Sequence, residues 1–410
     1  MKKTILALLA GGSLVLGAFS MGQGNHATAA PAAFKDVPAS HWAKNAIDDA
    51  VSKGYLKGEG NGNFRPNAAV TRAEFAAILD RVSTNDVQTG VSTGTFSDLA
   101  GHWSEKEVSE AAGKGFFQAS DYPGGFKPNT PLTRVEMAKW MATGLAAKDA
   151  DYKTALSDTK DTIVPVTEYY KGGLNQADYP YVSVALGTGL MSGYPDDSFG
   201  AGKTTTRAEV AVILQRYAGT QGKAAESSKA LNELREVGLT GTNVRTVAPN
   251  LAITDGGLQK IYGKNVNLRN GIATVQIHHF IFIPGSTLAD LGSVYGRMFV
   301  DKEYMVNSKN YLVLIDETVT PNVDNFTYQK YLGAIDNDFK AGFRVEGDVS
   351  KKFGYKTPPN DGSHFFDKGK GVRMWSAGMF VKLFDQGENR YSTTITATDG
   401  TEIRVVYTKF

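Results

Sequence analysis

Residues 71–74 read Thr-Arg-Ala-Glu, and the same pattern returns as Thr-Arg-Val-Glu at 133–136 and as Thr-Arg-Ala-Glu at 206–209. Seven residues before each Thr stands a Phe, at Phe64, Phe126 and Phe199. A Gly precedes that Phe in every copy, at Gly54, Gly115 and Gly189. A recurring set of residues in one order indicates structural repeats. The first half of the chain therefore consists of three related units.

Each unit predicts two helices joined by a loop rich in Gly and Asn. In the first unit, apolar residues recur at helical spacing from Trp42 to Val51, and Gly54 suits the position that ends a helix. The second helix should begin at the Thr of the motif. Thr-x-x-Glu is a capping box, in which the Thr hydroxyl and the Glu carboxylate each accept a hydrogen bond from the other residue's backbone N–H. Helix initiation thereby accounts for the Thr and the Glu.

Capping does not account for the Arg of the motif. Its charge lies in the first turn of a helix, where the helix dipole disfavours a cation. We interpret Arg72, Arg134 and Arg207 as residues that bind a carboxylate or phosphate, together with free N–H groups at the helix start. The alternative is an ion pair with the acid of an apolar-x-Asp pattern that opens each unit. These acids are Asp36, Asp98 and Asp158.

Aromatic residues distinguish the first two units from the third. A His-Trp pair precedes the first helix at His41-Trp42 and at His102-Trp103. Such a Trp belongs either to the core or to a groove wall on which a sugar packs, and the sequence leaves both open. In the third unit Ala177 stands at the Trp position, and in the second Ala119 replaces Gly58. We therefore expect unequal grooves, with the first two motifs forming the better ones.

Together these residues resemble the S-layer homology (SLH) repeat. The resemblance rests on Phe34-x-Asp36, His41-Trp42, Gly54, Phe64-x-Pro66-Asn67 and the Thr-Arg-x-Glu motif, with their counterparts in the other units. It implies a mainly α trimer of repeats with pseudo-threefold symmetry, with repeats at 34–82, 96–145 and 156–217 within residues 30–217. It also implies binding to secondary cell-wall polysaccharide, often bearing ketal-linked pyruvate. The polysaccharide-binding residues that it implies are Arg72, Arg134, Arg207, Asp36, Asp98, Trp42, Trp103 and Gly58.

The N-terminal residues predict export. Lys2 and Lys3 precede an apolar run, and Ala27-Thr28-Ala29 offers a cleavage site, so residues 1–29 should be a signal peptide. The apolar run is short for a bilayer span of about 20 residues. We find no second run of spanning length and no sorting signal at the C-terminus. The repeats should therefore hold a secreted protein at the extracellular face of the cell wall or S-layer.

Composition excludes several classes of function. The chain has no Cys, so it has no disulfide, thiolate nucleophile or thiolate metal site. The formal net charge of +2 includes two Lys of the signal peptide, which leaves the mature chain near neutrality. Near-neutrality gives no support to a nucleic-acid partner. We predict no cofactor and no membrane span after signal cleavage.

The second half of the chain predicts a β-rich domain, so the overall class is α + β multidomain. Residues 218–243 indicate a linker with a helical segment, and residues 244–410 a mainly-β sandwich or barrel-like domain with helices at 286–299 and 325–340. Strands are expected at 272–283, 311–315, 343–345, 372–384, 391–398 and 402–408. Asp399-Gly400 predicts a hairpin between the last two strands.

This half shows no catalytic constellation in its sequence. His278 and His279 are adjacent in a predicted strand, so their side chains should point to opposite faces and should not share a metal. We interpret both as half-buried strand residues. The domain is predicted to be a binding or structural module rather than an enzyme, with other surface or S-layer proteins as further partners. The alternative is a wall-modifying hydrolase with its catalytic residues in 244–410.

Overall fold

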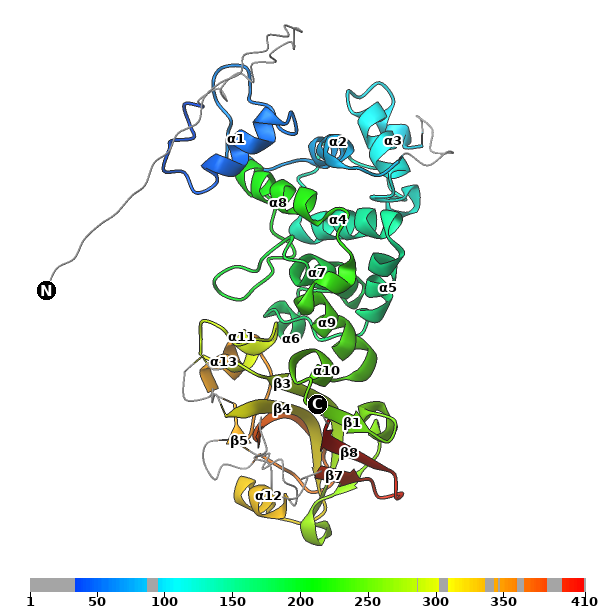
Figure 1. The fold of residues 1–410 in the computed structure, drawn as a ribbon, viewed down its shortest axis with the longest axis vertical. Coiled ribbons are helices and arrows are strands. Elements are labelled where there is room, and N and C mark those ends of the chain that lie inside the picture. Colours follow the sequence, from blue (N-terminus) through cyan, green and yellow to red (C-terminus); the bar gives the residue numbers. More distant parts are fainter. Residues whose placement is uncertain are drawn as a thin grey trace, which may run out of the picture.

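The computed structural model describes residues 34–86, 95–285, 287–301, 309–335, 343–345, 347–359, 365–381 and 393–408. The molecule is elongated, with the helices of the first half at one end and the strands of the second half at the other (Figure 1). The expected signal peptide lies outside the described residues. No helix in these ranges has both the length and the apolar character needed to cross a bilayer.

Three helix pairs form the repeats. The first helices of the pairs are α1 (Lys44–Ser52), α3 (Glu105–Gly113) and α7 (Tyr179–Gly187), and the second are α2 (Arg72–Val82), α4 (Arg134–Lys148) and α8 (Arg207–Thr220). Each motif Thr caps its helix by accepting a hydrogen bond from the backbone N–H of the motif Glu, which confirms the predicted starts. The reciprocal bond from the Glu side chain completes the capping box in α2 and α8.

A closed ring of backbone hydrogen bonds joins the three units. The N–H of Val70 donates to the carbonyl of Thr205 (3.0 Å), that of Thr205 to Leu132 (3.2 Å), and that of Leu132 to Val70 (2.8 Å). Each of these three residues comes from a different unit and directly precedes its motif Thr. The helical half therefore has the expected pseudo-threefold arrangement.

The apolar faces of the second helices fill the core of the helical half. Trp140 of α4 is fully buried and packs on Phe117, with ring centroids 4.3 Å apart, and on Phe126. The residues on these faces that are buried in agreement with the sequence pattern are Phe75, Ile78, Leu79, Val82, Met137, Trp140, Met141, Val210, Ile213, Leu214 and Tyr217. Burying these side chains is the main source of stability for this half.

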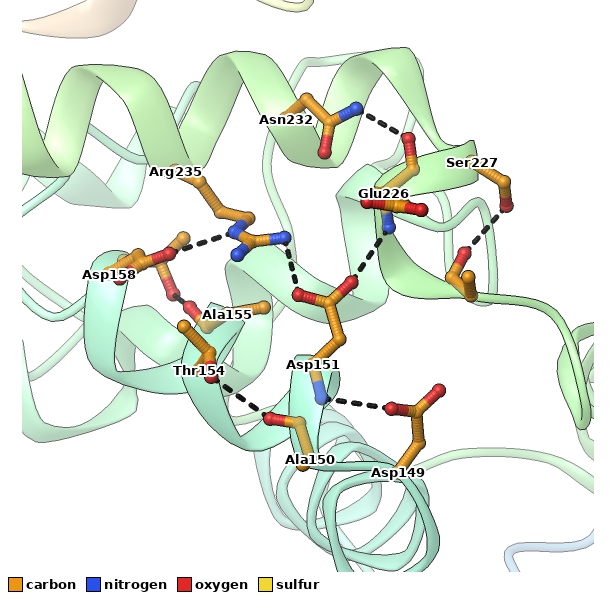
Figure 2. Close-up of polar contacts among 12 residues, drawn as sticks. Asp149, Ala150, Asp151, Thr154, Ala155, Asp158, Glu226, Ser227, Asn232 and Arg235 are labelled. Carbon is orange, nitrogen blue, oxygen red and sulfur yellow. Dashed lines mark hydrogen bonds and ion pairs between the residues drawn. The ribbon is translucent and has the colours of Figure 1, made fainter.

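Residues 218–243, which the sequence indicates as a linker with a helical segment, pack against both halves of the protein. It contains α9 (Lys229–Thr240), whose Leu231, Leu234 and Val237 are buried. Figure 2 shows the guanidinium of Arg235 between two carboxylates of α5 (Ala150–Asp158). Its nitrogens lie 3.0 Å from Asp151 and 2.8 Å from Asp158. The predicted helical segment is present as α9, and its apolar face is covered.

The second half contains two antiparallel sheets. The three-stranded sheet has the order β1 (Leu251–Thr254), β8 (Glu402–Tyr407), β7 (Thr393–Thr396). The five-stranded sheet has the order β2 (Val266–Asn267), β3 (Ala273–Ile283), β4 (Asn310–Pro321), β6 (Val372–Val381), β5 (Phe343–Arg344). β7 and β8 pair as the predicted hairpin. β4 runs beyond the predicted 311–315 because its polar Asp316 and Glu317 are still paired in the ladder.

Short helices complete the described chain. They are α6 (Glu168–Lys171), α10 (Val244–Val247), α11 (Gly296–Phe299), α12 (Tyr328–Ala334) and α13 (Gly347–Phe353). The single 3-10 turns are η1 (Ser97–Leu99), η2 (Ala119–Asp121), η3 (Gln176–Asp178), η4 (Ala225–Ser227), η5 (Leu258–Ile261) and η6 (Arg269–Gly271). The helix expected at 286–299 is reduced to α11, because Gly292 adopts a left-handed backbone (φ 64°).

The five-stranded sheet has a separate apolar core on each face. One core lies between this sheet and the strands β1 and β8. The other contains Ile281, Leu314 and Trp375 of the sheet together with Leu234 and Val237 of α9. The two halves of the protein therefore share a core, and the sheet is fixed to the third repeat.

Gly238 provides a test of this joint. A Cβ at Gly238 would overlap the backbone carbonyl of Asp158, so Gly238→Ala must push α9 away from α5. We expect the free energy of unfolding to fall by about 1–3 kcal/mol. Gly219→Ala in α8 is the matched control, because nothing lies within 4 Å of its added Cβ. It should raise stability by up to about 1 kcal/mol. Calorimetric melting temperatures that move in the same direction for both variants would contradict this packing.

Candidate functional site

The three motif Arg residues lie between neighbouring units. Each donates to the carbonyl of the loop Phe in the next unit, Arg72 to Phe126 (3.0 Å), Arg134 to Phe199 (2.8 Å) and Arg207 to Phe64 (2.8 Å). These hydrogen bonds join the first unit to the second, the second to the third and the third back to the first. The Arg residues thus repeat the symmetry of the backbone ring with charged side chains.

Two of these Arg side chains also pair with the capping Glu of the next unit. Arg72 Nε lies 2.8 Å from Glu136, and Arg134 Nη1 lies 3.8 Å from Glu209. Glu136 also accepts a hydrogen bond from the Tyr122 hydroxyl at 2.8 Å. Both contacts are to Oε1 of Glu136, and α4 shows only the Thr half of its capping box.

The helix starts behind the motif Arg residues do not offer the free N–H groups that the sequence interpretation assumed. The helix-start N–H groups are not free, because Arg72 N donates to Thr130 O at 3.0 Å and Arg134 N to Lys203 O at 2.9 Å. The alternative, an ion pair of a motif Arg with Asp36, Asp98 or Asp158, is not found among the described residues. Asp36 instead accepts from the backbone N–H of Phe64 at 2.8 Å. Asp98 accepts from that of Phe126 at 3.0 Å.

In the third unit the acid that opens the repeat is Glu168 and not Asp158. Glu168 accepts from the backbone N–H of Phe199 (2.9 Å) and of Gly200 (2.6 Å), as Asp36 does for the first loop. Asp158 instead pairs with Arg235. Spacing could have found Glu168, since 28 residues separate Asp36 from its Phe and 31 separate Glu168 from Phe199.

The two Trp residues lie on the surface. Trp42 is 66% exposed and Trp103 is 58% exposed, so the core alternative is wrong for both. Each directly precedes an N-cap residue, and each packs on its neighbouring His. Ala177 precedes the first residue of α7 by the same number of positions. The structure thus presents two equivalent exposed aromatic faces and lacks the third.

Gly58 has a packing role. A Cβ at this position would overlap the ring of Phe34 and lie 3.1 Å from the carbonyl of Asn63. The loop closes here, with Glu59 N donating to Asn63 O at 2.9 Å. Only Gly permits this approach of the loop to Phe34, whatever else the residue contacts.

The loop of the third unit is bound to the second half of the chain. Asp197 lies 2.6 Å from Arg297 and also pairs with Lys352. A pocket of about 630 Å³ is lined by this loop, around Tyr194, and by Val294 and Arg297. The third repeat therefore contacts the β-rich half with the loop that corresponds to the exposed loops of the other units.

The pKa values of two adjacent carboxyl groups of β4 are shifted in opposite directions. Burial raises the pKa of Asp316, but hydrogen bonds from Arg373 and His279 outweigh it and hold this pKa at about 2. Burial raises the pKa of Glu317 to about 7, with Ser376 and Tyr331 as hydrogen-bond donors. The two groups point to opposite faces of the strand, so they are not the facing carboxyl pair of a glycoside hydrolase.

The expectation for His278 and His279 was half right. Both are half-buried, but a β-bulge follows Ile277 and shifts the register, so the two rings line the same pocket. The simple alternation of strand side chains fails at such a bulge. Among the described residues no group of three His, Asp or Glu could hold a metal ion.

Comparison with known proteins identifies the repeats. The model of the S-layer homology domain matches residues 33–76, 95–138 and 175–211. The S-layer protein sap of Bacillus anthracis is 27% identical over 65% of this chain and 32% of its own length. The cellulosome-anchoring protein of Acetivibrio thermocellus is 33% identical over 25% of this chain and 24% of its own. An amylopullulanase of Thermoanaerobacterium thermosulfurigenes is 27% identical over 44% of this chain and 9% of its own length. The chain thus spans about a third or less of these relatives.

Arg134 provides a test of the inter-unit contacts. It is 4% exposed and bonds the carbonyls of Phe199 and Ser192, so Arg134→Gln leaves buried acceptors unpaired. We expect a loss of about 1–3 kcal/mol in the free energy of unfolding. Arg216→Gln is the control, because Arg216 is exposed and its guanidinium donates to the hydroxyl of Ser192. Equal urea midpoints for the two variants would contradict a structural role for Arg134.

Glu317 should make folding stability depend on pH. Its folded pKa of about 7 exceeds the ordinary 4.5, so between these values the unfolded state ionises first and stability falls as pH rises. The slope for one such group is about 1.4 kcal/mol per pH unit. Glu317→Gln should flatten this part of the profile relative to the unchanged protein. Parallel stability profiles from pH 4.5 to 7 would show that Glu317 is not buried as described.

Proposed function

Because this chain is an SLH-domain protein, we propose that it is an exported surface protein held non-covalently on secondary cell-wall polysaccharide. Its repeats form the anchor, and the β-rich half is the module that they hold at the cell wall or S-layer. Support comes from the three matched repeats and from relatives that include an S-layer protein and a cellulosome-anchoring protein.

The observation that carries the proposal is the pair of exposed Trp residues at equivalent positions. Large apolar side chains on a surface lose solvent-exposed area when a partner covers them, and the indole face suits the C–H face of a sugar ring. Trp42 and Trp103 are the two most exposed large hydrophobic side chains among the described residues. We assign one polymer-binding groove to each.

The other expected contacts divide into two roles. The Arg72 side chain is 18% exposed and lies over the Tyr122 ring, so it can still meet an acidic substituent such as ketal-linked pyruvate. Asp36, Asp98 and Gly58 shape the loops that form the grooves. Arg134 and Arg207 are more deeply buried and would act mainly by fixing the neighbouring unit.

We further propose that the third repeat serves attachment of the β-rich half instead of polymer binding. It lacks the Trp, and its Asp197 is engaged by Arg297 and Lys352. Two grooves on one polymer still give firm anchoring, since binding at one raises the effective concentration at the other. The β-rich half is proposed as a binding or structural module, with other surface or S-layer proteins as partners. The amylopullulanase relative is an enzyme, so a hydrolase anchored by such repeats is the second candidate.

Sedimentation with purified cell-wall sacculi tests the anchor. The unchanged protein should pellet with sacculi and stay in solution once the polysaccharide is chemically extracted from them. Trp42→Ala and Trp103→Ala should each weaken binding about tenfold, which corresponds to about 1.4 kcal/mol. Leu332→Ala is the matched control, because it removes an exposed apolar side chain from α12 of the other half.

Two results would overturn the anchor proposal. One is undiminished pelleting with extracted sacculi, which would identify a different wall component as the ligand. The other is undiminished affinity of the Trp42→Ala/Trp103→Ala double variant. For the hydrolase candidate, release of sugar or peptide fragments from sacculi by the protein would decide in favour of an enzyme.

A further inference from the structure

A polar pocket lies at the joint between α9 and the five-stranded sheet. Its volume is about 390 Å³, and its walls come from the end of α9, from the third repeat and from the sheet. The polar side chains that line it are Asp161, Tyr262, His278, His279 and Arg373. None of them belongs to the proposed polymer grooves of the first two repeats.

A buried carboxylate fixes two of these side chains. Asp316 is 2% exposed and accepts from Arg373 Nε at 2.9 Å, from Arg373 Nη2 at 2.5 Å and from His279 Nδ1 at 2.8 Å. Two parallel bonds hold the guanidinium plane in one orientation. The Arg373 side chain is nevertheless 57% exposed. A charged group that is both fixed and accessible is preorganised for a ligand.

The bulge in β3 adds the second His to the same pocket. His278 is the extra residue, and its Nε2 lies 2.8 Å from the Thr318 hydroxyl. Burial lowers the pKa of His278, so at neutral pH its ring is uncharged and can accept as well as donate. Without the bulge, His278 and His279 would point to opposite faces of the strand. The bulge places both side chains in the lining of one pocket.

Several polar atoms of the lining have no partner within the described part of the chain. These are Arg373 Nη1, His279 Nε2, His278 Nδ1 and the Tyr262 hydroxyl. Asp161 accepts one hydrogen bond from Gln176 at 3.0 Å, and its other oxygen has only Lys160 at 3.9 Å. The pocket thus offers a cation, an anion and neutral donors and acceptors on different sides.

We propose that this pocket binds one sugar unit that carries a carboxylate. The carboxylate would meet the free edge of Arg373, and sugar hydroxyls, which both donate and accept, would pair with Asp161, Tyr262 and the two His. The partly exposed ring of Tyr262 and the exposed Leu239 supply apolar surface for the C–H face of the sugar. The pocket lies within the size range of small-molecule sites, about 300–1,000 Å³.

Calorimetric titration of the whole protein with glucuronate tests the proposal. Glucose and acetate are the comparison probes, because each supplies one half of the recognised chemistry. Glucuronate should bind at least about tenfold more tightly than either, since each retains only part of the hydrogen bonds. Equal affinity for all three probes, or no saturable heat with glucuronate, overturns the proposal.

Variants outside the buried ion pair keep the test independent of folding. Tyr262→Phe and Asp161→Asn should each weaken glucuronate binding about three- to tenfold without changing the melting temperature. Asp324→Asn is the control, because Asp324 is an exposed acid near α12. Unchanged affinity in both pocket variants contradicts the site. The Trp42→Ala/Trp103→Ala double variant should titrate as the unchanged protein does, so failure of this site and failure of the wall anchor are separable.

Discussion

The first backbone N–H groups of any α-helix have no partner within the helix. In this protein the second helix of each repeat meets that constraint with the loop of the next repeat, as in the bond from Arg207 N to Ala68 O at 2.9 Å. Three such junctions close into a ring. The Arg side chains then bond loop carbonyls across the same junctions. The capping Thr of each repeat satisfies only part of its helix start, so the three repeats must fold together, and the order of the grooves around the axis is fixed.

This constraint separates assembly from recognition. The motif Arg residues, the Asp residues that open the first two repeats and Gly58 hold loops against neighbouring elements. The Trp side chains pack only on their neighbouring His within the described residues and are mostly exposed. The third repeat retains the assembly residues, with Glu168 as the opening acid, but has lost the Trp and has gained contacts to the β-rich half. A shared core beneath α9 then makes the second half a rigid extension of the anchor. A module mounted in this way would be presented at a defined orientation to the wall.

Local chemistry in the sequence predicted the local structure well. The Thr-x-x-Glu pattern located three helix starts, the apolar spacing located their buried faces, and Asp399-Gly400 located a hairpin. The failures concern information that is not local. The acceptors of Arg134 lie 58 positions away at Ser192 and 65 positions away at Phe199. The packed state of α9 depends on helices and strands on both sides of it. His278 and His279 share a pocket only because of one extra residue in β3, and a bulge leaves no clear mark in a single sequence.

We propose that the fold provides two polymer grooves and uses its third repeat as a mount for the β-rich half. The stoichiometry of binding tests this most directly. Calorimetric titration of the whole protein with a short, soluble, purified fragment of the wall polysaccharide should saturate at two fragments per chain. Three fragments per chain would show that the third repeat binds as the others do, and that contact with the β-rich half does not replace recognition. A single fragment per chain would show that Trp42 and Trp103 do not serve separate grooves.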